Sequence, residues 1–162
     1  SSDGTIIAIG GPLNDGNGES SGHVRVYKYE LSDLFQLGIG QWVQLGSDID
    51  GEVAYDESGS SVSLSSDGKI LAVGSPRSDG PGGLYQNVGK VIIYEYQSND
   101  WIQIGKIYGE GVLDQCGYSV SLSSDGTVLA IGAPYNQGNN VNGLWTGHTR
   151  IYKFENNSTH RV

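Results

Sequence analysis

The sequence predicts an all-β protein made of repeated four-stranded antiparallel sheets. One phrase occurs three times, as SSDGTIIAIGGP from Ser1, SSDGKILAVGSP from Ser65 and SSDGTVLAIGAP from Ser123. A glycine-rich loop and a second shared phrase follow each copy, reading GHVRVYKY, GKVIIYEY and GHTRIYKF. The hydrophobic residues are mainly Val, Ile, Leu and Tyr, which favour strands over helices. Strand-like phrases of constant length between loops of varying length indicate a repeated supersecondary unit.

Each unit is expected to contain four short strands. The first, SVSLS at 61–65, alternates serine with apolar residues, the period-2 pattern of a strand. Asp-Gly at 67–68 predicts a tight turn, because glycine accepts the positive φ of such turns. The second strand is KILAVGS, and the third, VIIYEY, is apolar on both faces and should be covered on two sides. The fourth, WIQIG, places Trp101 and Ile102 on opposite faces, and LSDLFQLG at 31–38 allows one helical turn.

A recurring Ala-φ-Gly step ends at Gly10, Gly74 and Gly132. Small residues inside a strand usually mark close approach of neighbouring backbone. A short sheet with two apolar faces must also be packed on both sides. Either a radial, β-propeller-like arrangement of blades or a linear array of stacked blades would provide that packing.

We therefore expect one repeat domain over residues 1–162. The repeats run over 1–64, 65–122 and 123–162, with the third truncated. The first blade should lack its first strand and the last blade its fourth. Incomplete blades of this kind would leave strand edges open for pairing.

The order Gly-x-Ser-Val-x-Leu-x-x-Asp-Gly, followed by Ala-φ-Gly-x-Pro and Gly-x-Val-x-φ-Tyr, resembles the FG-GAP repeat of integrin-α-like β-propellers. It is also similar to the arrays of GHVRVY…WVQLGSDIDGE…SVSLSSDG repeats in predicted surface proteins of aquatic microbes and algae. The resemblance covers nearly the whole chain. It implies four-stranded propeller blades, an extracellular or cell-surface location, and structural work or cell adhesion rather than catalysis.

Calcium is the ion that the resemblance brings into question. FG-GAP blades often bind it in the loop between strands one and two, but Ser63 and Ser65 replace the early ligands here and Leu71 replaces the closing acidic residue. We therefore expect the turn without the ion, and no cofactor. A second acidic stretch could bind Ca²⁺, or could form a solvated connection between blades. Its members are Asp48, Asp50, Glu52, Asp56 and Glu57.

The sequence also argues against nucleic-acid binding, a membrane span and catalysis. Eighteen acidic and nine basic residues give a net charge of −9, which argues against a nucleic-acid partner, and no apolar run approaches the ~18–20 residues of a membrane span. Cys116 is alone, so we expect a half-buried thiol, with an intermolecular disulfide as the alternative. His23 and His148 share a repeat position that Lys90 fills, which suggests surface. No nucleophile, phosphate-binding or Cys/His motif is present, and we predict that the chain is not an enzyme.

The remaining candidate sites lie in loops. Tyr85, Tyr135 and Trp145 follow the prolines of the second and third copies and could stack on sugars, dock on a protein or cover their own blade edge. NNST holds two overlapping N-glycosylation sequons, at Asn156 and Asn157.

These observations predict a non-enzymatic extracellular protein, structural or adhesive. It would self-associate into an oligomer or filament through open strand edges or blade faces, so its main partners would be copies of itself. The alternative is a propeller fragment that binds glycans or cell-surface proteins through its aromatic loop residues.

Overall fold

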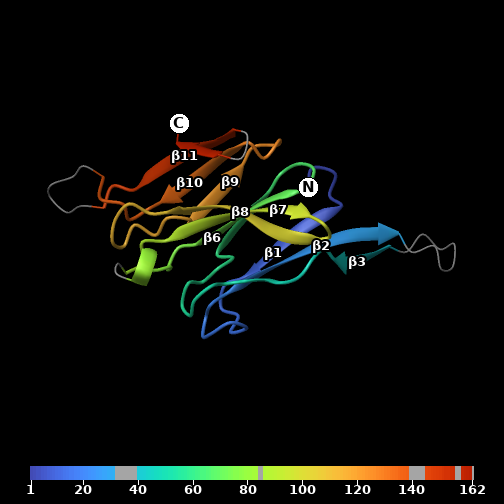
Figure 1. The fold of residues 1–162 in the computed structure, drawn as a ribbon, viewed down its shortest axis with the longest axis horizontal. Coiled ribbons are helices and arrows are strands. Elements are labelled where there is room, and N and C mark those ends of the chain that lie inside the picture. The colour runs from blue at the N-terminus through green and yellow to red at the C-terminus, as the bar shows by residue number, and fades with distance from the viewer. Residues whose placement is uncertain (32–39, 84–85, 139–144, 156–157, 162) are drawn as a thin grey trace.

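Three four-stranded antiparallel sheets follow one another along the chain, and none closes into a barrel (Figure 1). The structure, a computed structural model, describes residues 1–31, 40–83, 86–138, 145–155 and 158–161. Strands make up 51% of it and helix 2%, so the all-β prediction is confirmed. The helical turn expected at 31–38 falls almost entirely outside the described residues. None of the helical segments described has the length and apolar character of a bilayer span.

The first sheet has the order β1-β2-β3, with a short β4 also paired to β2. Its strands are β1 (Ile6–Gly11), β2 (His23–Leu31), β3 (Gly40–Gln44) and β4 (Ile49–Asp50). The outer strand is thus interrupted, since β3 pairs with the end of β2 and β4 with its beginning. Among the described strands, β1 pairs with β2 alone, which leaves its other edge open.

The second sheet has the order β5-β6-β7-β8, the four strands predicted for a complete unit. They are β5 (Ser61–Leu64), β6 (Ile70–Ser75), β7 (Lys90–Gln97) and β8 (Asp100–Tyr108), with a 3₁₀ turn at Pro81–Gly83 between β6 and β7. A register shift between Ile93 and Tyr94 allows β8 to continue well past the predicted WIQIG.

The third sheet corrects the prediction of a missing fourth strand. It contains β9 (Ser119–Leu122), β10 (Val128–Ala133), β11 (His148–Glu155) and β12 (Ser158–Arg161), in the order β12-β11-β10-β9. The segment STHR pairs with β11 from Glu155–Ser158 to Tyr152–Arg161. An outer strand needs backbone partners more than apolar side chains, so its polar sequence carried no strand signal.

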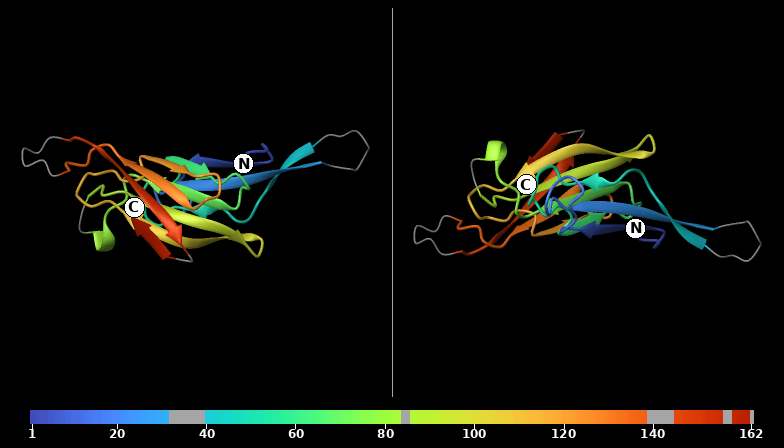
Figure 2. Two further views of the ribbon diagram at one scale, coloured as in Figure 1. Left: turned by 90° about the horizontal axis from the view of Figure 1, so that it is seen from above. Right: turned by 90° about the horizontal axis from the view of Figure 1, so that it is seen from below.

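The sheets pack face to face, with the second sheet in the middle (Figures 1 and 2). One face of the middle sheet packs on the first sheet, where Leu71 and Val73 join the cluster that contains Val24. The opposite face packs on the third sheet, where Ile93 joins the cluster that contains Leu129. This arrangement confirms the prediction that VIIYEY is covered on two sides.

The SSDG turns have the predicted geometry. Gly4, Gly68 and Gly126 take φ values of 73°, 70° and 71°. In the middle copy the Ser65 hydroxyl donates to the Asp67 carboxylate over 2.7 Å and accepts the Ile70 amide over 2.9 Å. The other two copies repeat both bonds. A serine hydroxyl therefore closes each of the three turns.

Two glycines of the Ala-φ-Gly step, Gly10 and Gly74, lie where one sheet meets the connection to the next. A Cβ on Gly10 would overlap the carbonyl oxygen of Gly59, and a Cβ on Gly74 would overlap that of Gly117. The predicted close approach of backbone is confirmed at these two positions. At Gly132 the nearest group is the Ser119 hydroxyl of the same sheet.

Candidate functional site

A buried lysine of the second sheet pairs with the segment that connects the first sheet to the second. The Nζ of Lys90, at the start of β7, lies 2.7 Å from Asp56 and 2.6 Å from Glu52, and Lys106 of β8 also pairs with Glu52. The side chains of Lys90 and Asp56 are 3% and 4% exposed. Burial opposes the charge of Lys90, but the hydrogen bonds to Asp56 and Glu52 outweigh it and raise the pKa of the ammonium group.

This position corrects the expectation that the residue shared by His23, Lys90 and His148 lies on the surface. Lys90 is buried and both histidines are partly buried. The carboxylates of the preceding connection compensate for the buried charge, and without such partners a lysine would not be buried here.

Four of the five residues of the acidic stretch pair with basic residues of the chain. Besides the two carboxylates on Lys90, Asp48 pairs with Arg25 over 2.8 Å and Glu57 with Arg77 over 3.2 Å. Ion pairs therefore replace the solvated connection that the sequence suggested. The cause is that both flanking sheets place cations against this segment.

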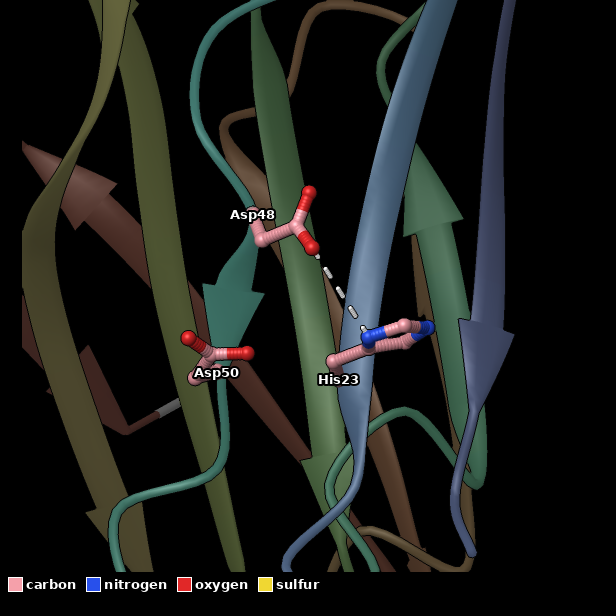
Figure 3. A group of neighbouring side chains, drawn as sticks. All are labelled: His23, Asp48 and Asp50. Atoms are coloured by element: carbon pink, nitrogen blue, oxygen red, sulfur yellow. Dashed lines mark ion pairs between the residues drawn. The ribbon is translucent and has the colours of Figure 1, made fainter. Parts of the chain in front are cut away.

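His23, Asp48 and Asp50 form a small cluster beside β2 and β4 (Figure 3). Among the described residues, one ligand atom from each lies within 4.8 Å of the others, close enough to hold a metal ion. Asp48, however, already accepts two hydrogen bonds from Arg25 Nε and Nη2 and one from Gln44. The bonds from Arg25 lower the pKa of Asp48. Arg25 thus brings the positive charge that a cation would supply, and we interpret the cluster as an ion-pair group.

A pocket of about 520 Å³ lies at the junction of the second and third sheets. Buried Asp114 accepts hydrogen bonds from Asn136 Nδ2 over 2.7 Å and from the backbone amides of Glu110 and Gly111. His148 Nδ1 lies 3.0 Å from Asn136 Oδ1. The histidine thus reaches the buried aspartate through an amide rather than by direct ion pairing.

The first junction has a matching pocket of about 490 Å³. Four lining residues occupy equivalent repeat positions in the two pockets. Those of the first junction are Glu52, Asp56, Ser78 and Lys90, and their equivalents at the second junction, in the same order, are Glu110, Asp114, Asn136 and His148. The pocket is therefore a property of the repeat. The charge of the pocket differs between the two junctions, because His148 replaces Lys90 at the second one.

Arg150 and Cys116 lie deep at this second junction. Arg150 is buried, with Nη1 3.4 Å from the Glu110 carboxylate and 3.4 Å from the Tyr108 carbonyl oxygen. Cys116 is fully buried, and burial raises the pKa of its thiol to about 11. The expectation of a half-buried thiol is corrected, and a sulfur in this position is not presented to another chain.

The structure brings two predicted loop residues together. The rings of Tyr135 and Trp145 meet edge to face with centroids 5.7 Å apart, and the residues are 39% and 60% exposed. They belong to the loop that carries Asn136 of the pocket. Tyr85, Asn156 and Asn157 lie outside the described residues.

The outer sheets expose faces that the middle sheet buries. Ile9 of β1 is 51% exposed, whereas Val73, at the same repeat position, is 0% exposed. Ile151 of β11 is 47% exposed, whereas Ile93 is 0% exposed. The alternation of the sequence predicted strands at all four residues. It did not indicate which face of a sheet has no other sheet packed against it.

No family model and no curated protein matches this sequence. Among solved structures, the chain is similar to a protein from Bacteroides fragilis described as a candidate 6-phosphogluconolactonase, with 14% identity and a TM-score of 0.54. The match covers 99% of this chain and 35% of that protein, so the chain spans about a third of its length. At this identity the similarity concerns the fold alone, which is propeller-like.

This comparison corrects the prediction that the chain is not an enzyme. A protein named as an enzyme shares the architecture, so the fold gives no reason to exclude catalysis. The similarity to FG-GAP repeats stays a prediction, since no family model supports it.

Proposed function

We propose that this chain is an extracellular or cell-surface repeat protein with a structural or adhesive role, which self-associates through the outer faces of its stacked sheets. The contrast between the buried Val73 and Ile93 and the exposed Ile9 and Ile151 carries the proposal. Three propeller-like repeats within residues 1–162 are part of it.

Faces are a better route to association than edges. Full burial of an isoleucine side chain stabilises by about 1.5–3 kcal/mol, and both outer faces carry several half-buried apolar residues. The open edge of β1 offers backbone groups, whose net contribution per hydrogen bond is about 0.5–1.5 kcal/mol. Radial closure and linear stacking would both cover the faces.

Light scattering after size exclusion tests the proposal on the pure chain over a range of concentrations. We expect a particle mass that rises above 17.2 kDa with concentration, and electron microscopy should show rings or filaments. A particle of 17.2 kDa at every concentration would overturn it.

Glycan binding is the second candidate. It is favoured by the exposed Tyr135–Trp145 pair, in the loop that lines the pocket between the second and third sheets. Aromatic faces beside Asn and Asp side chains suit the stacking and hydrogen bonding of a sugar. Glycan-array binding should be lost in Trp145→Ala. The matched control is Trp42→Ala, whose indole makes a similar edge contact with Tyr29 on the first sheet.

A further inference from the structure

We infer that association is head-to-tail: the open face of the third sheet in one copy docks on the open face of the first sheet in the next copy. This inference rests on the proposed self-association and specifies its geometry. We call the side that a sheet turns toward the following sheet its forward face, and the opposite side its rear face.

The forward faces are equivalent in all three repeats. In the first two sheets this face packs against the next sheet, and its residues are buried or partly buried: Ile6, Ala8, Val24 and Val26, then Ile70, Ala72, Val91 and Ile93. The third sheet presents Val128, Ala130, Thr149 and Ile151 at the same positions. Of these, Ile151 is 47% exposed, Thr149 is also exposed, and Val128 and Ala130 are partly exposed.

The rear faces show the complementary pattern. Leu71 and Val73 of β6 are fully buried against the first sheet, and Leu129 and Ile131 of β10 against the second. The first sheet carries isoleucines at these positions, including the exposed Ile9. Each internal interface joins one forward face to one rear face, so the two faces left open form the same kind of pair.

The turns supply a specific fit. Ile6 packs over Gly68, with its Cδ1 2.6 Å from where a Cβ would lie, and Ile70 packs over Gly126 in the same way. Val128 and Gly4 are the corresponding residues at the two open faces. No atom lies within 4 Å of a Cβ position on Gly4 among the described residues, so space is free for Val128 of another copy.

A backbone ladder runs through the same turns. The Ser2 amide donates to the Ser66 carbonyl over 3.0 Å, and the Ser66 amide donates to the Ser124 carbonyl over 2.8 Å. Within the described part of the chain, neither the Ser124 amide nor the Ser2 carbonyl has a hydrogen-bond partner. Head-to-tail docking would join these two groups and continue the ladder.

Such a contact is heterologous, because each copy uses two different faces. A pair of copies still has one open face at each end, so growth continues until a ring closes or a filament forms. A contact between two identical faces would stop at the dimer.

Two variants test the pairing. Ile151→Asp places a charge on the forward face and Ile9→Asp places one on the rear face, and each alone should weaken self-association at least about tenfold. When the variants are mixed, the intact forward face of Ile9→Asp should dock on the intact rear face of Ile151→Asp. Light scattering should then show a complex of two copies that grows no further. Ile104→Asp, at an equally exposed position on the outer strand β8, should assemble like the unmodified chain.

The outcomes separate the two proposals. A monomeric unmodified chain overturns self-association and the inference together. Association that persists in either variant, or a mixture that remains monomeric, overturns the head-to-tail pairing while self-association stands. Circular dichroism checks that the variants fold, and the milder pair Ile151→Ser and Ile9→Ser repeats the experiment if either does not.

Discussion

The ammonium group of Lys90 lies 2.7 Å from the carboxylate of Asp56, and both side chains are buried between the first and second sheets. The contact joins the start of β7 to the connection that precedes its sheet. Because each buried charge needs the other as its partner, the pair holds this connection against the start of β7.

Replacement of Lys90 by Met should destabilise the chain by about 3–5 kcal/mol, because Asp56 would remain buried without its counter-charge. Urea denaturation followed by circular dichroism measures the change. Lys28→Met serves as the control, since Lys28 forms a half-exposed pair with Glu30 and should cost less than about 1 kcal/mol. Equal losses in the two variants would contradict the role of burial.

Gly74→Ala should destabilise the fold by about 1–3 kcal/mol, because the new methyl group would overlap the Gly117 carbonyl oxygen. Gly132→Ala is a matched control at the same repeat position. In both variants the methyl group meets a serine hydroxyl of the same sheet, which can rotate away, but only Gly74 also faces a neighbouring backbone. Thermal unfolding should therefore show a smaller loss for Gly132→Ala, and a larger one would refute this account.

The thiol of Cys116 should not react with a chromogenic disulfide reagent at pH 8 in the folded chain. The sulfur is buried and its pKa is raised to about 11, so little thiolate forms and the reagent has no access. The same chain in guanidinium chloride should react with one equivalent. Fast reaction under native conditions would show that the second junction opens.

Asp125 should titrate near pH 2. The hydrogen bond from the Ser123 hydroxyl, followed by those from Thr127, lowers its pKa from 3.8 to about 2. The stabilisation of the turn by the carboxylate is therefore complete above pH 3.8 and is lost as the pH falls through about 2. A carbon-detected NMR titration measures the midpoint. In Ser123→Ala it should move back toward 3.8, and an unmoved midpoint would rule out the hydroxyl as the main cause.

Predictions from sequence succeeded where the cause is local. The Asp-Gly turns, the strands around them and the tight step at Gly74 depend on φ preference, side-chain alternation and the size of one residue. These properties are visible within a few positions of the chain. The repeated phrases added that neighbouring units must pack alike.

Predictions failed where the cause is distant in sequence. Lys90 has its carboxylate partners 38 and 34 residues away, and a charged residue at the head of a strand gives a surface signal on its own. The strand β12 was missed because its polar residues pair through the backbone. The prediction that the chain is not an enzyme was inferred from missing motifs. It was wrong, since a protein named as an enzyme shares the fold.

Local sequence was therefore enough to define the unit, its turns and the residues that form its two faces. The tertiary structure alone decided which of those faces is covered, which charges are buried, and that Tyr135 meets Trp145. Strand alternation assigns a side chain to a face within its own sheet, but burial depends on whether another sheet lies opposite. That is why Val73 and Ile9, equivalent in sequence, differ in the surface they leave to solvent.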